Sequence, residues 1–202
     1  MKTCYIVGAS DCAPLPEIKD EDFVIAADGG YDMLLRQGIT PGLLIGDFDS
    51  ISKLPEGIEA LRHKVRKDET DMHLAYLEGA RRGYESFEIY GGTGGRADHT
   101  FANYSLLLYI KAHGNEAKLV DEATESFIIK NEKKLIWGKP GKHFSVFAFG
   151  GTAEGVTIKD ASYEACDAYL DPAFPLGVSN VFLDTPAEVS VKNGALLIIS
   201  EK

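Results

Sequence analysis

The 202-residue chain has few cysteines, no long apolar run and a shortage of basic side chains, and each of these removes a class of protein. Cys4, Cys12 and Cys166 lie far apart, which argues against a disulfide framework and favours a reducing compartment. No stretch approaches the roughly 20 apolar residues of a membrane span, and the apolar run after Met1 is too short for a signal peptide. We therefore expect a cytoplasmic protein that does not enter the membrane.

The charge balance also limits the partners of the chain. Lys and Arg number 21 against 31 Asp and Glu, a formal charge of -10. This excess of negative charge opposes non-specific binding to nucleic acid or to anionic membranes. An anionic substrate would need local help from a metal ion or from well-placed Arg and Lys side chains. Hydrophobic residues make up 45% of the chain, which is enough for a packed core that needs no disulfide bonds.

Residues 1–122 alternate short apolar runs with helical patterns. The apolar runs are continuous, as in strands buried on both faces, so we predict an α/β domain with a mostly parallel sheet. Each expected helix is followed by a glycine, a common helix terminator. The expected strands are Cys4–Gly8, Phe23–Ala27, Leu43–Ile45, Phe87–Tyr90 and Lys118–Val120, and the expected helices are Tyr31–Gln37, Thr70–Arg82 and Asp98–His113.

Residues 123–202 have a different sequence pattern, with short β-rich runs separated by Gly, Pro, Asn or Asp. This spacing predicts an antiparallel β-sandwich. Asn193-Gly194, between the runs Ala187–Lys192 and Ala195–Ser200, predicts a β-hairpin with a type I′ turn. The other expected strands are Ser126–Lys130, Lys133–Trp137, Phe144–Phe149, Val156–Lys159 and Val178–Leu183.

The segment Leu44-Ile45-Gly46-Asp47-Phe48-Asp49-Ser50 is the most informative motif. It reads as a strand that ends at a glycine and then offers two carboxylates two residues apart. Magnesium is usually held by one or two carboxylates, with substrate phosphates and water in its other positions. By itself the motif is equally compatible with a polar turn and an Asp-Ser helix cap.

Other loops that follow expected strands add to this motif. The carboxyl ends of parallel strands converge on one crevice, where ligands of open α/β folds bind. Asp28-Gly29-Gly30 follows one strand, and Lys67-Asp68-Glu69-Thr70-Asp71 precedes a helix. Asp71 is either a site carboxylate or a first-turn residue that favours the helix dipole. Four carboxylates in one crevice, Asp28, Asp47, Asp49 and Asp71, would repel one another unless cations neutralised them.

A glycine-rich loop, Gly91-Gly92-Thr93-Gly94-Gly95-Arg96, leads into the third expected helix. It has neither a Gly-Lys-Ser/Thr ending nor Gly-x-Gly-x-x-Gly spacing, so it matches neither common nucleotide loop. Its backbone amides and the helix N-terminus nevertheless suit phosphate, and the planar fork of Arg96 can bind phosphate oxygens in pairs. His99 is either a phosphate donor or, as we favour slightly, a buried helix-start residue. Asn103, one turn later, either reaches the crevice or packs between helices.

These motifs, in order, resemble those of the thiamine pyrophosphokinase family. The matching pieces are Ala27 to Gly30, Pro41 to Ile51, Lys67 to Asp71, Gly91 to Asn103, and Gly177-Val178-Ser179-Asn180. The resemblance runs through nearly the whole chain. It implies an N-terminal α/β domain, a C-terminal β-sandwich, and a homodimer with active sites between one subunit's α/β domain and the other's sandwich. It also implies transfer of a pyrophosphoryl group from ATP to thiamine, giving thiamine diphosphate and AMP.

The resemblance also assigns roles to residues. Asp47, Asp49 and Asp71 would hold Mg²⁺ and, with Asp98, form the catalytic set. Thiamine would bind to Tyr163, Ser179 and Asn180. The family commonly has Gly-Leu-Lys and then an aromatic residue where this chain has Asp160-Ala161-Ser162-Tyr163, so the aromatic is kept and the preceding residues differ. ATP would bind to Asp28, Gly29, Lys67, Gly92, Thr93, Gly94, Gly95, Arg96, His99 and Asn103.

Overall fold

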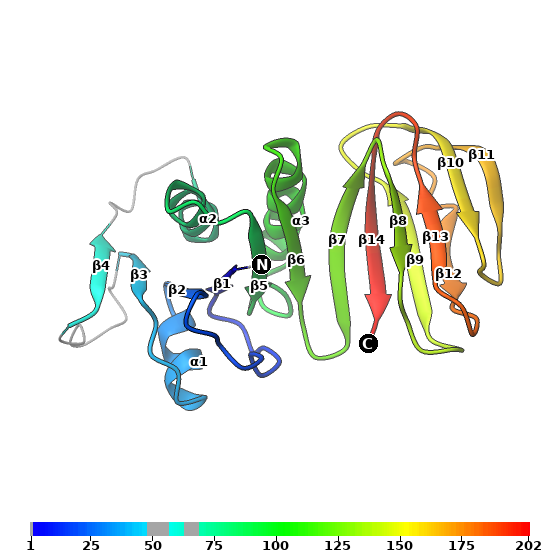
Figure 1. The fold of residues 1–202 in the computed structure, drawn as a ribbon. Helices are drawn as coiled ribbons and strands as arrows, with labels where there is room; N and C mark the ends of the chain where they lie inside the picture. The colour runs from blue at the N-terminus through cyan, green and yellow to red at the C-terminus, as the bar shows by residue number, and fades with distance from the viewer. Residues whose placement is uncertain (1, 48–56, 63–68) are drawn as a thin grey trace. The chain divides into compact units, whose positions relative to one another are not determined.

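The computed structural model describes residues 2–47, 57–62 and 69–202 (Figure 1). It confirms the predicted fold class, with a parallel sheet and helices in the N-terminal part and antiparallel strands in the C-terminal part. The N-terminal elements are β1 (Thr3–Val7), β2 (Phe23–Ala27), α1 (Gly30–Arg36), β3 (Leu43–Gly46), β4 (Glu59–Arg62), α2 (Asp71–Arg81), β5 (Ser86–Tyr90), α3 (Ala97–Ala112) and β6 (Glu116–Val120). The C-terminal elements are β7 (Thr124–Lys130), β8 (Lys133–Ile136), β9 (His143–Ala148), β10 (Ala153–Lys159), β11 (Ala165–Leu170), β12 (Gly177–Val181), β13 (Ala187–Ser190) and β14 (Ala195–Glu201).

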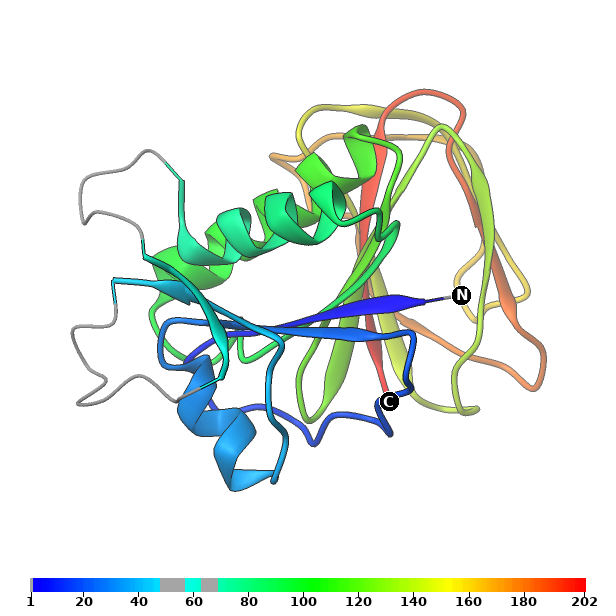
Figure 2. The same ribbon diagram turned by 60° about the vertical axis from the view of Figure 1, so that its left-hand side comes forward.

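The N-terminal sheet has the strand order β6-β5-β1-β2-β3-β4, and each neighbouring pair is parallel. Its central strands β1, β2 and β3 are almost entirely buried, as expected for continuous apolar runs between two helical layers. Helix α1 lies on one face of this sheet, and helices α2 and α3 lie on the other (Figure 2). The ends of these strands position the loops described below.

A glycine lets helix α2 approach the sheet closely. A Cβ atom on Gly79 would lie 2.8 Å from a ring carbon of Phe87 and 2.9 Å from the sulfur of Cys4. Cys4 and Phe87 are both fully buried in strands β1 and β5. Burial also raises the pKa of the Cys4 thiol to about 12, so this cysteine stays protonated and acts as a small apolar residue.

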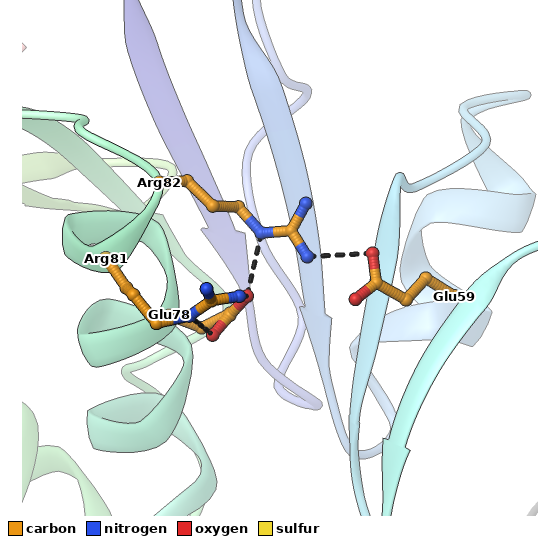
Figure 3. Close-up of polar contacts among 4 residues, drawn as sticks. All are labelled: Glu59, Glu78, Arg81 and Arg82. Atoms are coloured by element: carbon orange, nitrogen blue, oxygen red, sulfur yellow. Dashed lines mark hydrogen bonds and ion pairs between the residues drawn. The ribbon is translucent and has the colours of Figure 1, made fainter.

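A network of charges ties the C-terminal end of α2 to strand β4 (Figure 3). Glu78, nine-tenths buried, accepts hydrogen bonds from Arg81 and from Arg82, the latter at 2.8 Å. The guanidinium of Arg82 also donates to Glu59 at 2.7 Å and lies 4.7 Å from the ring centre of Phe23. A largely buried carboxylate is thus compensated by two cations, which is the condition for keeping such a charge in the fold.

The C-terminal strands form two packed antiparallel layers. One layer has the order β12-β9-β14-β7, and the other is a 4-stranded sheet of order β11-β10-β13-β8. Alternate residues of both layers point inward and build one apolar core, which includes Phe144, Phe182 and Ile198. The rings of Phe144 and Phe182 lie 4.5 Å apart. This arrangement is the predicted β-sandwich.

The predicted hairpin at Asn193-Gly194 is wrong. Strand β13 pairs with β8 and β10, whereas β14 pairs with β7 and β9, so the chain changes layers at this point. Other partners occupy the backbone there. Glu154 exchanges hydrogen bonds with Asn193, and the amide of Gly194 donates to the Asn131 side chain at 2.9 Å. These long-range contacts outweigh the local turn preference of Asn-Gly.

The chain divides into two compact units. One consists of Met1–Leu106 and Gly114–Glu122, and the other of Leu107–His113 and Ala123–Lys202. The last turns of α3 thus belong to the second unit, where Lys111 pairs with Glu132 at 2.7 Å. Within the ranges that the structure describes, no helix combines the length and the apolar character needed to cross a bilayer.

Candidate functional site

The first unit contains a pocket of about 660 Å³ at the carboxyl ends of its strands. The loops after β1, β2 and β5 and the first turns of α2 and α3 form its walls, as the geometry of parallel sheets predicts. The lining residues are Gly8, Ala9, Ser10, Asp11, Ala27, Asp28, Glu69, Thr70, Asp71, Met72, Gly91, Gly92, Gly94, Gly95, Arg96, His99, Thr100, Ala102 and Asn103.

The glycine-rich loop packs against the loop that follows β1. The amide of Ser10 donates to the Gly91 carbonyl at 3.2 Å. Gly91 has φ of 62°, and a Cβ atom on it would lie 2.5 Å from the carbonyl oxygen of Gly8. A Cβ atom on Gly95 would lie 2.6 Å from the Ser10 hydroxyl. The glycines therefore allow two backbone segments to meet at the pocket, where side chains would keep them apart.

Asn103, a residue of helix α3, binds the backbone of the glycine-rich loop. Its side-chain amide is buried and donates to the Gly92 carbonyl at 2.8 Å. Asn103 also lines the pocket, so it both contacts the pocket and packs against the loop. Thr93 does not line the pocket, and its hydroxyl lies 3.4 Å from the carboxylate of Asp121.

Arg96 and Asp98 form a two-armed ion pair at the start of α3. The Arg96 guanidinium donates to both Asp98 oxygens, at 3.1 and 2.5 Å, and both side chains are exposed. These hydrogen bonds hold the pKa of Asp98 below its ordinary value and raise the pKa of Arg96. Asp98 thus stays ionised at neutral pH, and Arg96 lines the pocket whereas Asp98 does not. The slight preference for a buried His99 is wrong, because His99 is exposed and lines the pocket.

The start of α2 brings an acidic side chain to the pocket. Thr70 is the N-cap, since its hydroxyl accepts a hydrogen bond from the amide of His73 at 3.2 Å. Asp71 is therefore in the first turn, where a carboxylate is favoured by the helix dipole, and it also lines the pocket. Both interpretations of Asp71 are thus compatible with its position.

Asp28 faces the same pocket from the end of β2. Its backbone is left-handed, with φ of 49°, and its amide donates to the Ile45 carbonyl at 2.8 Å. The Asp28 carboxylate occupies the space that a side chain on Gly46 would need. Asp47 follows Gly46 directly and is half-buried; its carbonyl accepts from Arg62 at 3.2 Å. Gly29 caps α1 and packs against Ala9.

Oxygen donors of the kind that magnesium prefers therefore line this pocket at Asp28 and Asp71, whereas Asp47, next to Gly46, does not line it. The chemistry of these donors fits a hard divalent cation. Asp49 and Lys67 lie outside the described residues. Within the described ranges, no group of three His, Cys, Asp or Glu side chains is arranged to hold a metal, so the set Asp47, Asp49 and Asp71 stays a prediction.

The loop Gly8-Ala9-Ser10-Asp11 was not expected in the site. Its signals in the sequence are a glycine directly after an apolar strand and the carboxylate of Asp11, whereas Ala9 and Ser10 carry no charge that marks a ligand. The amide of Gly8 donates to the Tyr90 carbonyl at 2.8 Å, which extends the pairing of β1 and β5 to the edge of the pocket. The position of this loop follows from which strands are neighbours, and sequence spacing does not reveal that.

The second unit has its own pocket, of about 530 Å³, in the β-sandwich. It brings together Tyr163, Ser179 and Asn180, the three residues assigned to thiamine by resemblance. Tyr163 is 68% exposed, whereas Asn180 is 5% exposed. The other walls are largely apolar and come from β10, β11 and the start of β12. An aromatic ring and a few polar groups on an apolar wall suit a flat organic ligand.

Solved structures share this arrangement of a parallel α/β unit and a β-sandwich. The crystal structure of thiamine pyrophosphokinase from Bacillus subtilis matches with a TM-score of 0.90 and 23% identity, over 100% of this chain and 99% of that chain. Thiamin pyrophosphokinase from Geobacillus thermodenitrificans matches with a TM-score of 0.85 and 23% identity, over 99% and 97% of the two chains. At these identities the likeness defines the fold, which is that of the solved thiamin pyrophosphokinases.

Sequence comparison identifies the family. The model described as thiamin pyrophosphokinase, catalytic domain, matches residues 16–119, more than half of the chain, and the vitamin B1 binding domain model matches residues 126–196. The curated thiamine pyrophosphokinase of Bacillus subtilis (strain 168) is 28% identical over 217 residues, covering 98% of each chain. The chain belongs to the thiamin pyrophosphokinase family.

Proposed function

We propose that the protein is a thiamine diphosphokinase, which transfers the pyrophosphoryl group of ATP to the hydroxyl of thiamine and yields thiamine diphosphate and AMP. The observation that carries this proposal is the glycine-lined pocket at the carboxyl ends of β1, β2 and β5, with carboxylates on its walls. Its glycine-rich backbone and the N-terminus of α3 suit polyphosphate, and its acidic side chains suit the cation that accompanies ATP.

In this proposal the α/β domain, residues 1–122, binds ATP. Arg96 and Lys67 neutralise phosphate oxygens, and Gly92, Gly94 and Gly95 let the backbone approach the nucleotide. Gly29 and Asn103 hold the loops in place, and Thr93 contributes as part of the glycine-rich loop. His99 flanks the nucleotide, and Asp28 lies near the phosphates. Asp47, Asp49 and Asp71 would hold Mg²⁺, which supplies charge neutralisation to the phosphate oxygens.

The chemical step is displacement at the β-phosphorus. The thiamine hydroxyl oxygen forms a bond to that phosphorus, while the bond from the phosphorus to the oxygen that bridges to the α-phosphate breaks. AMP leaves with that oxygen, and the hydroxyl proton passes to a carboxylate. Of the two candidates, Asp71 lines the pocket, whereas Asp98 is paired with Arg96 and does not line it. Catalysis rests mainly on holding the alcohol in line with the leaving oxygen and on neutralising charge.

The β-sandwich domain, residues 123–202, would bind thiamine through Tyr163, Ser179 and Asn180. The ring of Tyr163 offers a π face to the pyrimidine or to the cationic thiazolium. We further propose a cytoplasmic homodimer with active sites shared between subunits, as the family resemblance implies.

Phosphorus NMR of the protein incubated with ATP, Mg²⁺ and thiamine tests the reaction. We expect thiamine diphosphate and AMP in equal amounts. ADP as the product would mean transfer of the γ-phosphoryl group instead. Saturable thiamine or nucleotide binding without any AMP would mean a binding or sensor protein on the same scaffold.

Asp71→Asn tests the acidic set, because Asp71 lines the pocket. We expect turnover to fall to less than about a tenth, which is ~1.4 kcal/mol in the barrier. Asp47→Ala and Asp49→Ala should do the same. Asp32→Asn is the matched control, since Asp32 is also a first-turn carboxylate, in α1, and does not line the pocket. Equal activities of the Asp71 and Asp32 variants would contradict the assigned role.

A further inference from the structure

Strand β12 carries a β-bulge next to the sandwich pocket. Gly177 pairs with Val146 and Asn180 pairs with Phe144, so Val178 and Ser179 together face the single residue Ser145 on β9. Ser179 has φ of 60°, a left-handed conformation that a residue other than glycine seldom adopts. A bulge of this kind redirects a side chain and interrupts the ladder of backbone hydrogen bonds. Here it sets the direction of a residue that lines the pocket.

Ser145 replaces the interrupted hydrogen bond. Its hydroxyl oxygen accepts from the amide of Ser179 at 3.1 Å, so a side chain, and not the facing backbone, holds the bulge in its left-handed form. Ser145 itself does not line the sandwich pocket; it lines a separate hollow with His143, Glu201 and Ser179, so Ser179 borders both hollows. The effect of Ser145 on a ligand in the sandwich pocket must therefore pass through Ser179.

Asn180 holds the Tyr163 backbone at the same pocket in a similar way. Its side-chain oxygen accepts from the amide of Tyr163 at 3.0 Å, and its side-chain nitrogen donates to the Tyr163 carbonyl at 2.7 Å. The same oxygen also accepts from the amide of Val181 at 2.8 Å. The oxygen thus has both of its acceptor positions filled, and the side chain is buried. Tyr163, in contrast, is exposed beside the pocket.

We propose that Ser145 and Asn180 are positioning residues, which fix Ser179 and Tyr163 as the two groups that touch the ligand. This inference deepens the proposed function and rests on it, because it takes thiamine as the ligand of this pocket. It also changes the role of Asn180 from a residue that binds thiamine directly to one that acts through the backbone of Tyr163. It assigns a part to Ser145, which lies outside the family motifs.

A matched pair of variants at Ser145 separates the hydroxyl from the shape of the side chain. Ser145→Thr keeps the hydroxyl. Ser145→Val introduces a side chain of nearly the same shape as threonine, but without the hydroxyl. We expect Ser145→Val to raise the KM for thiamine about fivefold, the ratio that one lost hydrogen bond gives. The KM for ATP should not change, and Ser145→Thr should restore the wild-type value. Equal thiamine KM values for the Val and Thr variants would overturn the proposal, as would an equal rise in both KM values.

Asn180→Ala tests the positioning role of Asn180, and Asn131→Ala is its control. The Asn131 side chain also accepts a backbone hydrogen bond, from Gly194, but it does not line the pocket. We expect the Asn180 variant to raise the thiamine KM by at least about fivefold, since it loses more than one hydrogen bond. The Asn131 variant should unfold more easily with its thiamine KM unchanged. A rise of similar size in both variants would contradict the proposal.

Amide hydrogen exchange gives a readout that does not depend on activity. The Ser179 amide should exchange faster in Ser145→Val than in Ser145→Thr, and the Tyr163 amide faster in Asn180→Ala than in wild type. Unchanged exchange would overturn the positioning roles. The variants could show these exchange differences although the wild-type protein forms no thiamine diphosphate. That result would refute the proposed function, but the hydrogen bonds from Ser145 and Asn180 to the backbone would still be supported.

Discussion

At the scale of single residues, Gly79 shows how packing can reverse a local preference. Alanine favours helix formation over glycine by about 1 kcal/mol in a helix interior. A Cβ atom at this position, however, would lie within 2.9 Å of both Cys4 and Phe87, which are fully buried. Overpacking of this kind costs about 1–3 kcal/mol. The packing cost should therefore exceed the gain in propensity.

We predict that Gly79→Ala lowers the stability of the α/β unit. Urea denaturation followed by circular dichroism would measure the midpoint, which should fall. A variant with an unchanged or higher midpoint would mean that α2 shifts outward without cost. The same contact explains why an apparently neutral substitution on a helix should disturb a sheet strand.

The candidate site was predictable from sequence only where its residues carry chemistry of their own. Asp28, Asp71 and Arg96 are charged and follow or precede apolar runs, so their convergence on one pocket was expected. The loop from Gly8 to Asp11 was missed, because its place beside Gly91 depends on the pairing of β1 with β5. Likewise, no feature of the sequence reveals that the Asn180 side chain is committed to Tyr163.

At the scale of elements, the Glu78 network joins the end of α2 to strand β4. Hydrogen bonds from Arg81 and Arg82 lower the pKa of Glu78 from its ordinary value of 4.5. A carboxyl group with a lowered pKa stabilises the folded state fully above its unfolded-state pKa. That contribution is lost as the pH falls through the folded-state value.

We predict that Glu78→Gln lowers the free energy of unfolding at neutral pH by about 2 kcal/mol, the size expected for charged hydrogen bonds. The variant should also lose less stability than wild type between neutral pH and pH 3, since it lacks the titrating group. Denaturation midpoints across this pH range would measure both effects. Glu59→Gln is the control: its carboxylate is half exposed, so the loss should stay below about 1 kcal/mol. Parallel pH curves for wild type and Glu78→Gln would contradict the assignment.

The strands and helices that were predicted are those with strong apolar runs or clear caps. β2 was expected at the bounds it has, and α2, expected at Thr70–Arg82, is one residue shorter at each end. β4 and β11 were not expected, because their residues are mostly exposed and their sequences lack an apolar run. Edge strands of this kind are specified by their neighbours. The prediction of a hairpin at Asn193-Gly194 was wrong for the same reason, since contacts with Glu154 and Asn131 determine the course of the backbone there.

At the scale of the whole molecule, the proposed homodimer makes a simple prediction. Several large apolar side chains of the second unit are exposed, among them Tyr169, Phe174 and Leu176. Light scattering at working concentration should give a mass of twice the 22.0 kDa of the chain. A stable species of one chain mass that keeps full activity would exclude active sites shared between subunits.

The division of helix α3 has a practical consequence for producing either half of the protein alone. Leu107–His113 groups with Ala123–Lys202, whereas Gly114–Glu122, which comes between them in the sequence, groups with the N-terminal unit. The chain therefore passes from one unit to the other three times, and no single truncation point separates them. A fragment beginning at residue 123 would leave Glu132 without Lys111. One beginning at residue 107 would carry the strand β6 away from its partner β5.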